Sequence, residues 1–253
     1  MATWILLRGL MREQRHWGIF PAQLALALPN STIITPDLPG NGQRHGMDSV
    51  TNVLEMVEFL RQDLQAQKLK PPYHVLALSL GGMVAVEWAS RYPQEVVRCV
   101  LINTSMRPYN PFYQRLRWQN YPALLRQLLF GNPDSQEALI LRLTSSRYRD
   151  GNPALLADWR RFQQQYPVSQ RNALRQLLSA ARYRAPTSRP TMPVLIMAGA
   201  QDRLVDHRCS QQLARAWLAD CLIHREAGHD LPLDQGDWVA QSVARWVGYP
   251  SQS

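Results

Sequence analysis

The sequence predicts an α/β fold, in which a mainly parallel sheet of about six strands is covered by helices on both faces and interrupted by a helical cap. Three observations support this prediction. Apolar, β-branched runs of strand length alternate with segments of helical periodicity over most of the 253 residues. These runs are apolar almost throughout, which is typical of parallel strands that are buried on both faces. Between residues 105 and 190 the strand pattern stops and only helical patterns remain.

The first part of the chain alternates strands and helices. Its predicted elements are a strand over 3–8, a helix over 17–28, a strand over 31–35, a helix over 50–68, a strand, turn and helix over 73–92, and a strand over 96–104. Gly9 ends the first strand, and Pro29 ends the first helix. Apolar residues trace one face of the second helix, and we expect Ser49 to cap its N-terminus.

The insertion is predicted to contain four or five helices. Pro122 begins a helical run that Gly131 ends, Asn152 caps the next helix, and Ser169 begins another. The sheet then resumes with strands over 193–199 and 221–224, and the chain ends with a helix over 235–247. The predicted domains are therefore a core of residues 1–105 and 191–253, and a cap of residues 106–190.

The carboxyl edge of the sheet is the predicted location of the functional site. Strands that alternate with helices form right-handed crossovers, and parallel sheets of this kind bind ligands beyond the carboxyl ends of their strands. Gly9, Ser79, Asp202 and His229 all follow predicted strands. We expect these four residues to meet at that edge.

Ser79 is the predicted nucleophile, because it lies in a sharp turn between a strand and a helix. Its surroundings, Ala77-Leu78-Ser79-Leu80-Gly81, match a nucleophile elbow except that Ala77 replaces the usual first glycine. The turn forces strained backbone angles on the serine, and side chains larger than methyl two positions away would strike the neighbouring chain. The pattern therefore requires small residues where Ala77 and Gly81 occur.

A serine hydroxyl needs a base and an orienting acid to act as a nucleophile near neutral pH. His229 is the predicted base, because it lies among small residues in a loop just after the last strand. Asp202 ends the preceding strand and is the predicted acid, with Asp206 and Asp230 as reserves. The alternative for Asp202 is a turn aspartate paired with Arg203. The chain order of serine, aspartate and histidine favours the catalytic interpretation.

Two backbone amides are predicted to stabilise the oxyanion that forms during acyl transfer. One is the N–H of Leu80, which follows the nucleophile, and the other is the N–H of Leu10, which follows Gly9 at the end of the first strand. Because the donors are backbone groups, the leucine side chains are compatible with this role.

Together these segments resemble the α/β-hydrolase superfamily over nearly the whole chain. The segments are Arg8-Gly9-Leu10, Asp37-Leu38-Pro39-Gly40-Asn41-Gly42, Ala77-Leu78-Ser79-Leu80-Gly81-Gly82-Met83, Gly199-Ala200-Gln201-Asp202 and Gly228-His229. The sequence is also similar to small bacterial carboxylesterases, including the pimeloyl-acyl-carrier-protein methyl ester esterases. The resemblance implies a serine esterase that forms an acyl-enzyme and needs no metal or organic cofactor. Carbon–carbon bond cleavage by the same three residues stays open.

The chain departs from the family pattern at two places. Arg8 replaces the usual histidine before Gly9, and the chain starts directly at the first strand, so we expect a sheet without the amino-terminal hairpin. Arg8 either ties loops together through its several donors or binds an acyl carboxylate in the pocket. Relatives often place a tryptophan against the pocket shortly after the first loop, and Trp17 is the candidate for that substrate-binding position.

Positive charge is concentrated in the predicted cap. Residues 106–190 contain 14 arginines and four acidic residues, a net charge of +10, while the rest of the chain sums to −1. Such a segment attracts anions, so an acidic carrier protein, a coenzyme A thioester or an anionic lipid would suit it. A hydrolase of methyl esters or thioesters on an acidic acyl carrier is one alternative, and a catalytically silent scaffold that binds a polyanion is another. The cap aromatics are candidates for an apolar acyl tunnel or for packing within the cap.

The remaining composition argues against several other classes of protein. No apolar run reaches the roughly 18 residues of a membrane span, so we expect a cytoplasmic protein. The three cysteines form no C-x-x-C pair, so neither a zinc site nor a disulfide framework is predicted. We expect a small-molecule ester or acyl-carrier substrate, a possible acidic protein partner at the cap, and no nucleic acid.

Overall fold

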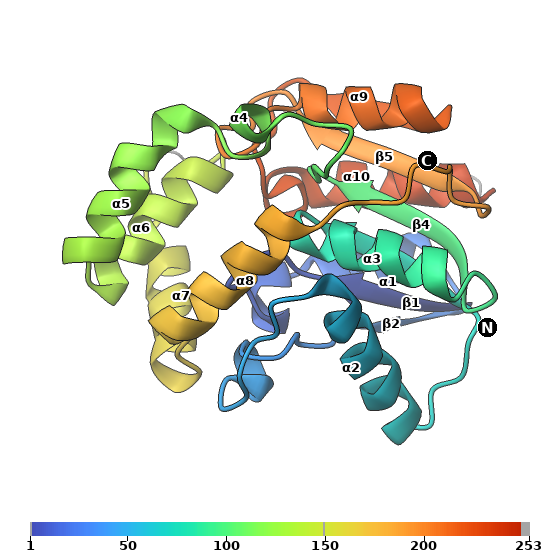
Figure 1. The fold of residues 1–253 in the computed structure, drawn as a ribbon, viewed down its shortest axis with the longest axis horizontal. Helices are drawn as coiled ribbons and strands as arrows, with labels where there is room; N and C mark the ends of the chain where they lie inside the picture. The colour runs from blue at the N-terminus through green and yellow to red at the C-terminus, as the bar shows by residue number, and fades with distance from the viewer. Residues whose placement is uncertain (1, 149, 249–253) are drawn as a thin grey trace.

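One parallel sheet organises the chain (Figure 1). The computed structural model describes residues 2–148 and 150–248. Its strands are β1 (Ala2–Leu7), β2 (Ser31–Ile34), β3 (Tyr73–Leu78), β4 (Val96–Ile102), β5 (Val194–Gly199) and β6 (Asp220–His224). They form a six-stranded sheet in the order β2-β1-β3-β4-β5-β6, and each neighbouring pair is parallel. The predicted fold class is therefore confirmed.

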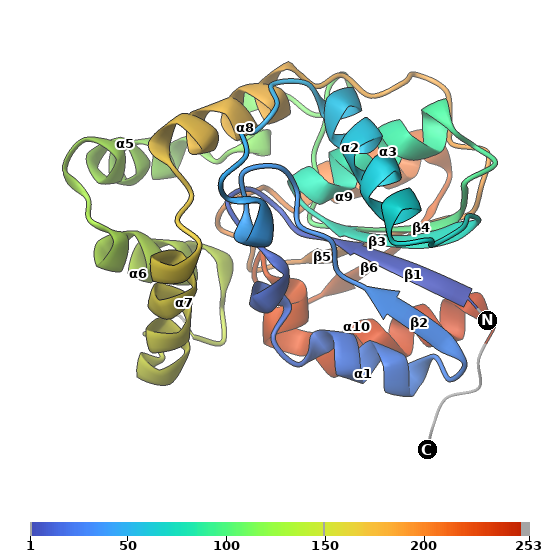
Figure 2. The ribbon, with the colours of Figure 1, turned by 90° about the horizontal axis from the view of Figure 1, so that it is seen from below.

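Helices cover both faces of the sheet (Figure 2). On one face lie α2 (Val53–Ala66), α3 (Leu80–Arg91) and α9 (Arg208–Trp217), and on the other lie α1 (Phe20–Ala27) and α10 (Leu231–Val247). Along β1, Ile5 and Leu7 pack into the first layer, while Trp4 and Leu6 pack into the second. Because both faces of the strand are buried, its sequence is an uninterrupted apolar run.

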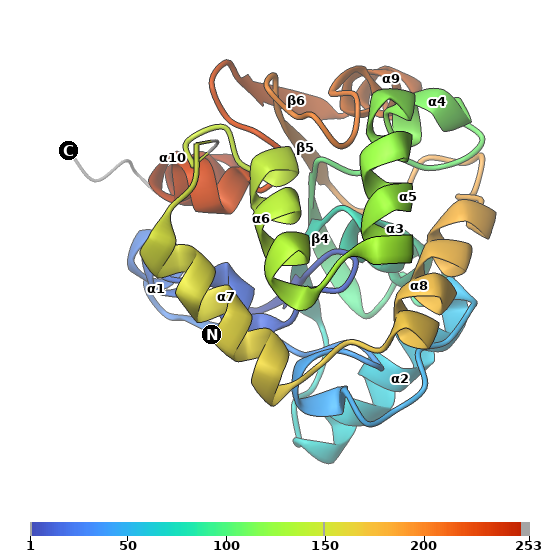
Figure 3. The same cartoon turned by 90° about the vertical axis from the view of Figure 1, so that its left-hand side faces the viewer.

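A group of helices projects beyond the carboxyl ends of the strands (Figures 2 and 3). Within the described residues these are α4 (Phe112–Arg115), α5 (Tyr121–Phe130), α6 (Pro133–Thr144), α7 (Pro153–Gln165) and α8 (Gln170–Arg182), with a short 3-10 helix over Trp118–Asn120. Asn152 caps α7 by accepting a hydrogen bond from Leu155 N, and Ser169 caps α8 by accepting one from Asn172 N. Both caps match the sequence prediction.

Two local predictions were wrong. Helix α2 begins only at Val53, and Asn52 caps it by accepting a hydrogen bond from Leu54 N. Ser49 is instead buried, and its amide donates to Asn172 Oδ1 of α8 over 2.8 Å. The predicted helix over 17–28 begins at Phe20, because Gly18 has a φ of 55° and interrupts it. No helix within the described residues has the length and apolar character needed to cross a bilayer.

Candidate active site

The turn between β3 and α3 has the geometry of a nucleophile elbow. Ser79 has φ 55° and ψ −117°, a region that costs a residue with a side chain about 1–3 kcal/mol. A Cβ atom on Gly81 would lie 2.4 Å from the carbonyl oxygen of Leu7 and 2.8 Å from that of Arg8. The helix can therefore start this close to β1 only because residue 81 is glycine.

The predicted base and acid are joined by a hydrogen bond. His229 Nδ1 lies 2.7 Å from Asp202 Oδ2, and both side chains are almost fully buried. The other carboxylate oxygen, Oδ1, accepts hydrogen bonds from Leu204 N over 2.8 Å and from Val205 N over 2.9 Å. Because a carboxylate only accepts, the proton of neutral His229 lies on Nδ1, and Nε2 is left free to accept a proton.

The two reserve acids have other partners. Asp206 forms an ion pair with Arg208 over 2.6 Å, and Asp230 forms one with Arg8 over 2.6 Å. Neither carboxylate contacts His229 through a hydrogen bond. Among these three aspartates, Asp202 is therefore the one hydrogen-bonded to the imidazole of His229.

The end of β4 connects the nucleophile to the histidine loop. Ser79 N donates to Ile102 O over 2.9 Å, and the next residue, Asn103, donates from Nδ2 to His229 O over 2.7 Å. Asn103 Oδ1 also accepts from Gly199 N over 3.0 Å, which joins the loop to the end of β5. Asn103 carries no charge and was not among the predicted site residues. A polar residue at the end of a buried strand was the available signal.

Ser79 Oγ and His229 share no hydrogen bond within the described residues. Contacts of this kind are often long in an unliganded enzyme and shorten when substrate binds. The buried tethers through Ile102 and Asn103 hold both groups at the same edge of the sheet.

The loop after β1 runs beside the nucleophile. A Cβ atom on Gly9 would lie 3.1 Å from Ser79 Cβ and 3.6 Å from Ser79 Oγ. In the part of the chain that the structure describes, the N–H groups of Leu10 and Leu80 have no hydrogen-bond acceptor. Leu80 is also the first residue of α3, where the helix dipole favours negative charge. Both amides are thus available to a developing oxyanion.

Arg8 and Trp17 lie in the interior, away from the open surface. Arg8 is 4% exposed, donates to both carboxylate oxygens of Asp230 over 3.2 and 2.6 Å, and lies 4.7 Å over the ring of Trp17. Trp17 is also buried and packs against Phe20, with ring centroids 5.6 Å apart. These contacts favour the structural alternative for Arg8, and Trp17 packs in the hydrophobic core beneath the sheet.

Comparison with known proteins identifies the family. Residues 4–242 match the model of the alpha/beta hydrolase family. The chain belongs to this family.

Three relatives give the range of the alpha/beta hydrolases that this chain resembles. The candidate carbamate hydrolase RutD of Yersinia enterocolitica is 28% identical over 84% of this chain and 74% of its own length. The pimeloyl-[acyl-carrier protein] methyl ester esterase of Chromobacterium violaceum is 31% identical over 36% of this chain and 34% of its own. The crystal structure of a candidate lipase from Acinetobacter baumannii AYE has a TM-score of 0.77, with 26% identity over 97% of this chain and 83% of that one.

Helix α8 of this hydrolase holds the loop after β1 in place. Gln176 of α8 is buried, and its Oε1 accepts a hydrogen bond from Met11 N over 2.8 Å. Its Nε2 donates to Asn41 Oδ1 over 2.8 Å and to Ser49 Oγ over 3.0 Å. Because Met11 directly follows Leu10, this side chain holds the backbone next to the Leu10 amide. Gln176 was not recognised in the sequence, because its partner is 165 residues away.

Replacing Gln176 by methionine is expected to lower kcat for ester hydrolysis about tenfold and to change KM by less than about twofold. Methionine keeps the length of the side chain but cannot accept the Met11 N–H, so the oxyanion donor loses its fixed position. Steady-state kinetics on a soluble aryl ester measure the effect. Gln170→Met, on the exposed start of the same helix, is the matched control. An unchanged kcat in Gln176→Met would show that the loop is held by other contacts.

A second cap contact depends on a neutral histidine. His16 is buried, and Arg12 Nη1 donates to its Nε2 over 3.0 Å while also pairing with Glu137 of α6 over 2.7 Å. Burial, followed by the charges of Arg12 and Arg8, holds the pKa of His16 well below its ordinary value of 6.5. The histidine therefore stays neutral in the folded chain while it titrates normally in the unfolded one.

We expect acidification to destabilise the wild-type hydrolase more than a His16→Gln variant. A histidine with a depressed folded pKa stabilises the fold above pH 6.5, and this contribution falls as the pH drops below 6.5, because only the unfolded chain takes up the proton. The difference should reach about 1 kcal/mol between pH 6.5 and 5.5. Urea unfolding at both pH values measures it. Parallel pH profiles of the two proteins would contradict the prediction.

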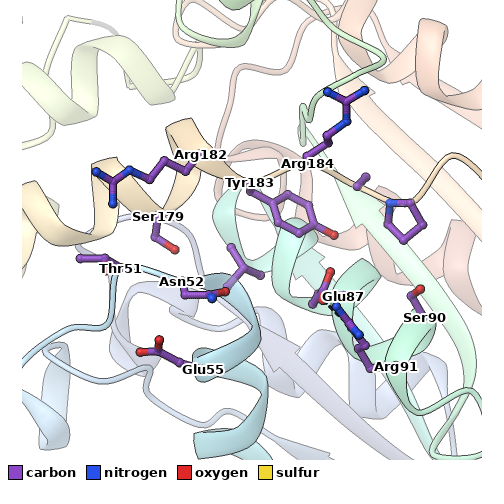
Figure 4. A pocket seen from close by; sticks show the side chains of 13 residues that line it. Thr51, Asn52, Glu55, Glu87, Ser90, Arg91, Ser179, Arg182, Tyr183 and Arg184 are labelled. Carbon is purple, nitrogen blue, oxygen red and sulfur yellow. Dashed lines mark hydrogen bonds and ion pairs between the residues drawn. The ribbon is translucent and has the colours of Figure 1, made fainter.

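A groove of about 750 Å³ lies between α2, α3 and α8 (Figure 4). Its lining includes Glu87 and Arg91, which form an ion pair over 3.0 Å, and none of the predicted site residues. Ser90 of the groove follows Ser79 by about three helical turns, or about 16 Å of helix rise. The groove is thus separate from the candidate active site. The described residues contain no group of three or more His, Cys, Asp or Glu arranged to hold a metal ion.

Proposed function

We propose that this hydrolase cleaves carboxylic esters through Ser79, His229 and Asp202. The observation that supports the proposal is the 2.7 Å hydrogen bond between His229 Nδ1 and Asp202 Oδ2, at the same edge of the sheet as the strained Ser79. That bond leaves His229 Nε2 as the proton acceptor that a serine nucleophile needs. Relatives include proteins named as an esterase and a candidate lipase.

The proposed reaction has two halves. Ser79 Oγ attacks the ester carbonyl as His229 Nε2 takes its proton, and the N–H groups of Leu10 and Leu80 stabilise the oxyanion. Collapse of the tetrahedral intermediate expels the alcohol, which receives the proton from His229, and leaves an acyl group on Ser79. Water, activated by His229, then releases the carboxylic acid and restores the serine. Asp202 stabilises the imidazolium in both halves.

A fluorophosphonate probe tests this proposal directly. We expect the probe to label Ser79, which mass spectrometry of the tryptic peptide would locate, and we expect Ser79→Ala to remain unlabelled. The silent scaffold alternative predicts an unreactive protein that binds a polyanion in a salt-sensitive way. Absence of labelling in folded wild-type protein would overturn the esterase proposal.

The arginine excess of residues 106–190 favours a second, finer candidate, an esterase or thioesterase for acyl groups on an acidic carrier protein. Arg160 and Arg161 already form ion pairs with Asp134 and Asp158. Two exposed cap arginines, Arg142 and Arg147, form no ion pair within the described residues.

Charge reversal of Arg142 and Arg147 tests the carrier candidate. We expect Arg142→Glu with Arg147→Glu to slow hydrolysis of a carrier-linked methyl ester while free aryl esters react at the wild-type rate. Reversal of the exposed Arg245, outside the cap, is the control. Equal rates on the carrier-linked ester would exclude docking on these two residues.

A further inference from the structure

The segment from α4 to α5 exposes an unusual amount of apolar surface. Among the side chains that the structure describes between residues 112 and 130, six large apolar ones are exposed, and we call them the α4–α5 surface: Phe112, Tyr113, Trp118, Tyr121, Leu125 and Phe130. Phe112 is 74% exposed, Trp118 61% and Phe130 83%. Four of these aromatics were candidates for an acyl tunnel or for cap packing, and their exposure fits neither role. Trp118 lies in the 3-10 helix that leads directly into α5, and Tyr121 and Leu125 lie in α5 itself. The three residues are spaced three and four positions apart, so they lie on one side of this helical segment.

The charge on this segment has one sign. Between Met106 and Pro133 the sequence contains four arginines and no aspartate, glutamate or lysine. Arg107 and Arg126 are exposed, and Arg115 and Arg117 are half-buried. Burial, and then the nearby charge of Arg107, lower the pKa of Arg115. The sequence between Met106 and Pro133 therefore combines exposed apolar side chains with cations and contains no acidic residue.

Gln114 and Asn120 of the segment are buried, and several hydrogen bonds anchor the segment next to Asp202, the proposed catalytic acid. Asn120 is buried and donates from Nδ2 to Arg203 O over 2.6 Å. Arg117 N donates to Leu204 O over 2.9 Å, and Asp206 N donates to Gln114 O over 2.9 Å. The α4–α5 surface is therefore held directly against the loop that carries Asp202, at the end of the molecule that faces the viewer in Figure 3.

We propose that the α4–α5 surface binds an anionic lipid bilayer. Aromatic and leucine side chains insert at the boundary between headgroups and acyl chains, and arginines bind the negative headgroups. A second copy of this chain is a poorer partner, because arginines would face arginines with no acid to pair them. A specific protein partner needs directional hydrogen bonds, and the buried polar residues Gln114 and Asn120 are turned away from the surface.

Binding would place the catalytic edge close to the bilayer, where apolar esters concentrate. This consequence rests on the proposed esterase function, whereas the binding itself does not. A Ser79→Ala protein is therefore expected to bind vesicles as the wild type does. A wild-type protein that binds vesicles but hydrolyses no ester would overturn the esterase proposal alone.

Vesicle sedimentation with the full chain tests the proposal. We expect binding to vesicles of phosphatidylcholine and phosphatidylglycerol in a 3:1 ratio, and much weaker binding to phosphatidylcholine alone or in 0.5 M NaCl. Replacing Trp118, Leu125 and Phe130 together by serine should lower the partition coefficient about tenfold or more, because three exposed apolar side chains are lost. The matched control replaces Ile19 and Leu218, which are 74% and 82% exposed on the core, by serine. This control should bind as the wild type does.

Activity on a water-soluble aryl ester reports whether each variant is folded. This activity should stay within about twofold of the wild-type value in the triple variant and in the control variant. Two results would overturn the proposal. One is equal binding of the wild type and the triple variant to anionic vesicles, or no binding by either. The other is a concentration-dependent dimer, measured by light scattering, that the triple variant abolishes, because a second copy would then cover the surface.

Discussion

Replacing Ser79 by alanine is expected to reduce kcat/KM for carboxylic esters by at least about 10⁴-fold. Only the hydroxyl group is lost. Without it residue 79 cannot form the bond to the acyl group that the reaction requires. Alanine is compatible with the fold, because it keeps the Cβ atom of residue 79 and adds no atom beside the nearby Gly9. Initial rates on p-nitrophenyl esters measure the effect, and circular dichroism confirms that the variant is folded.

Ser90→Ala is the matched control for this variant. Ser90 is an exposed serine on α3, the same helix that begins after Ser79. We expect its removal to leave kcat/KM within about twofold of the wild-type value, as for other exposed positions. A Ser79→Ala protein that keeps most of the wild-type activity would show that another group is the nucleophile.

Asp202→Asn is expected to lower kcat about 10⁴-fold with little change in overall structure. Asp202 Oδ1 is held by two backbone amides, those of Leu204 and Val205. An asparagine would keep its carbonyl oxygen there, so its NH₂ group would face His229 Nδ1. The histidine would then accept at Nδ1 and carry its proton on Nε2, which is the tautomer that cannot take a proton from Ser79.

The pH profile and a control separate this effect from general damage. At a pH well above the usual range activity should recover in part, because hydroxide can replace the missing base. Asp206→Asn alters an acid that pairs with Arg208, so its kcat should stay within about threefold of wild type. Equal losses in the two variants would mean that Asp202 has no special role in orienting His229.

The fold could be predicted from local patterns. Burial on both faces makes each strand an apolar run, and the elbow requires Ser79 between residues as small as Ala77 and Gly81. The candidate triad followed from the order of three residues relative to those strands. One prediction that failed concerns Ser49: serine is a residue type that favours N-caps, but the hydrogen bond that its amide donates to Asn172 Oδ1 of α8 determines its position.

Sequence alone was therefore sufficient for the sheet, the elbow, and the residues proposed as nucleophile, base and acid, because strand periodicity and tight-turn sterics act over a few neighbouring positions. Only the tertiary structure decided the side-chain partners. In the structure Arg8 pairs with Asp230, Gln176 accepts a hydrogen bond from the amide of Met11, and Asn103 donates one to the histidine loop. The α4–α5 surface is exposed. These outcomes depend on contacts between residues more than 100 positions apart or on the absence of a covering segment, and neither leaves a local pattern in the chain.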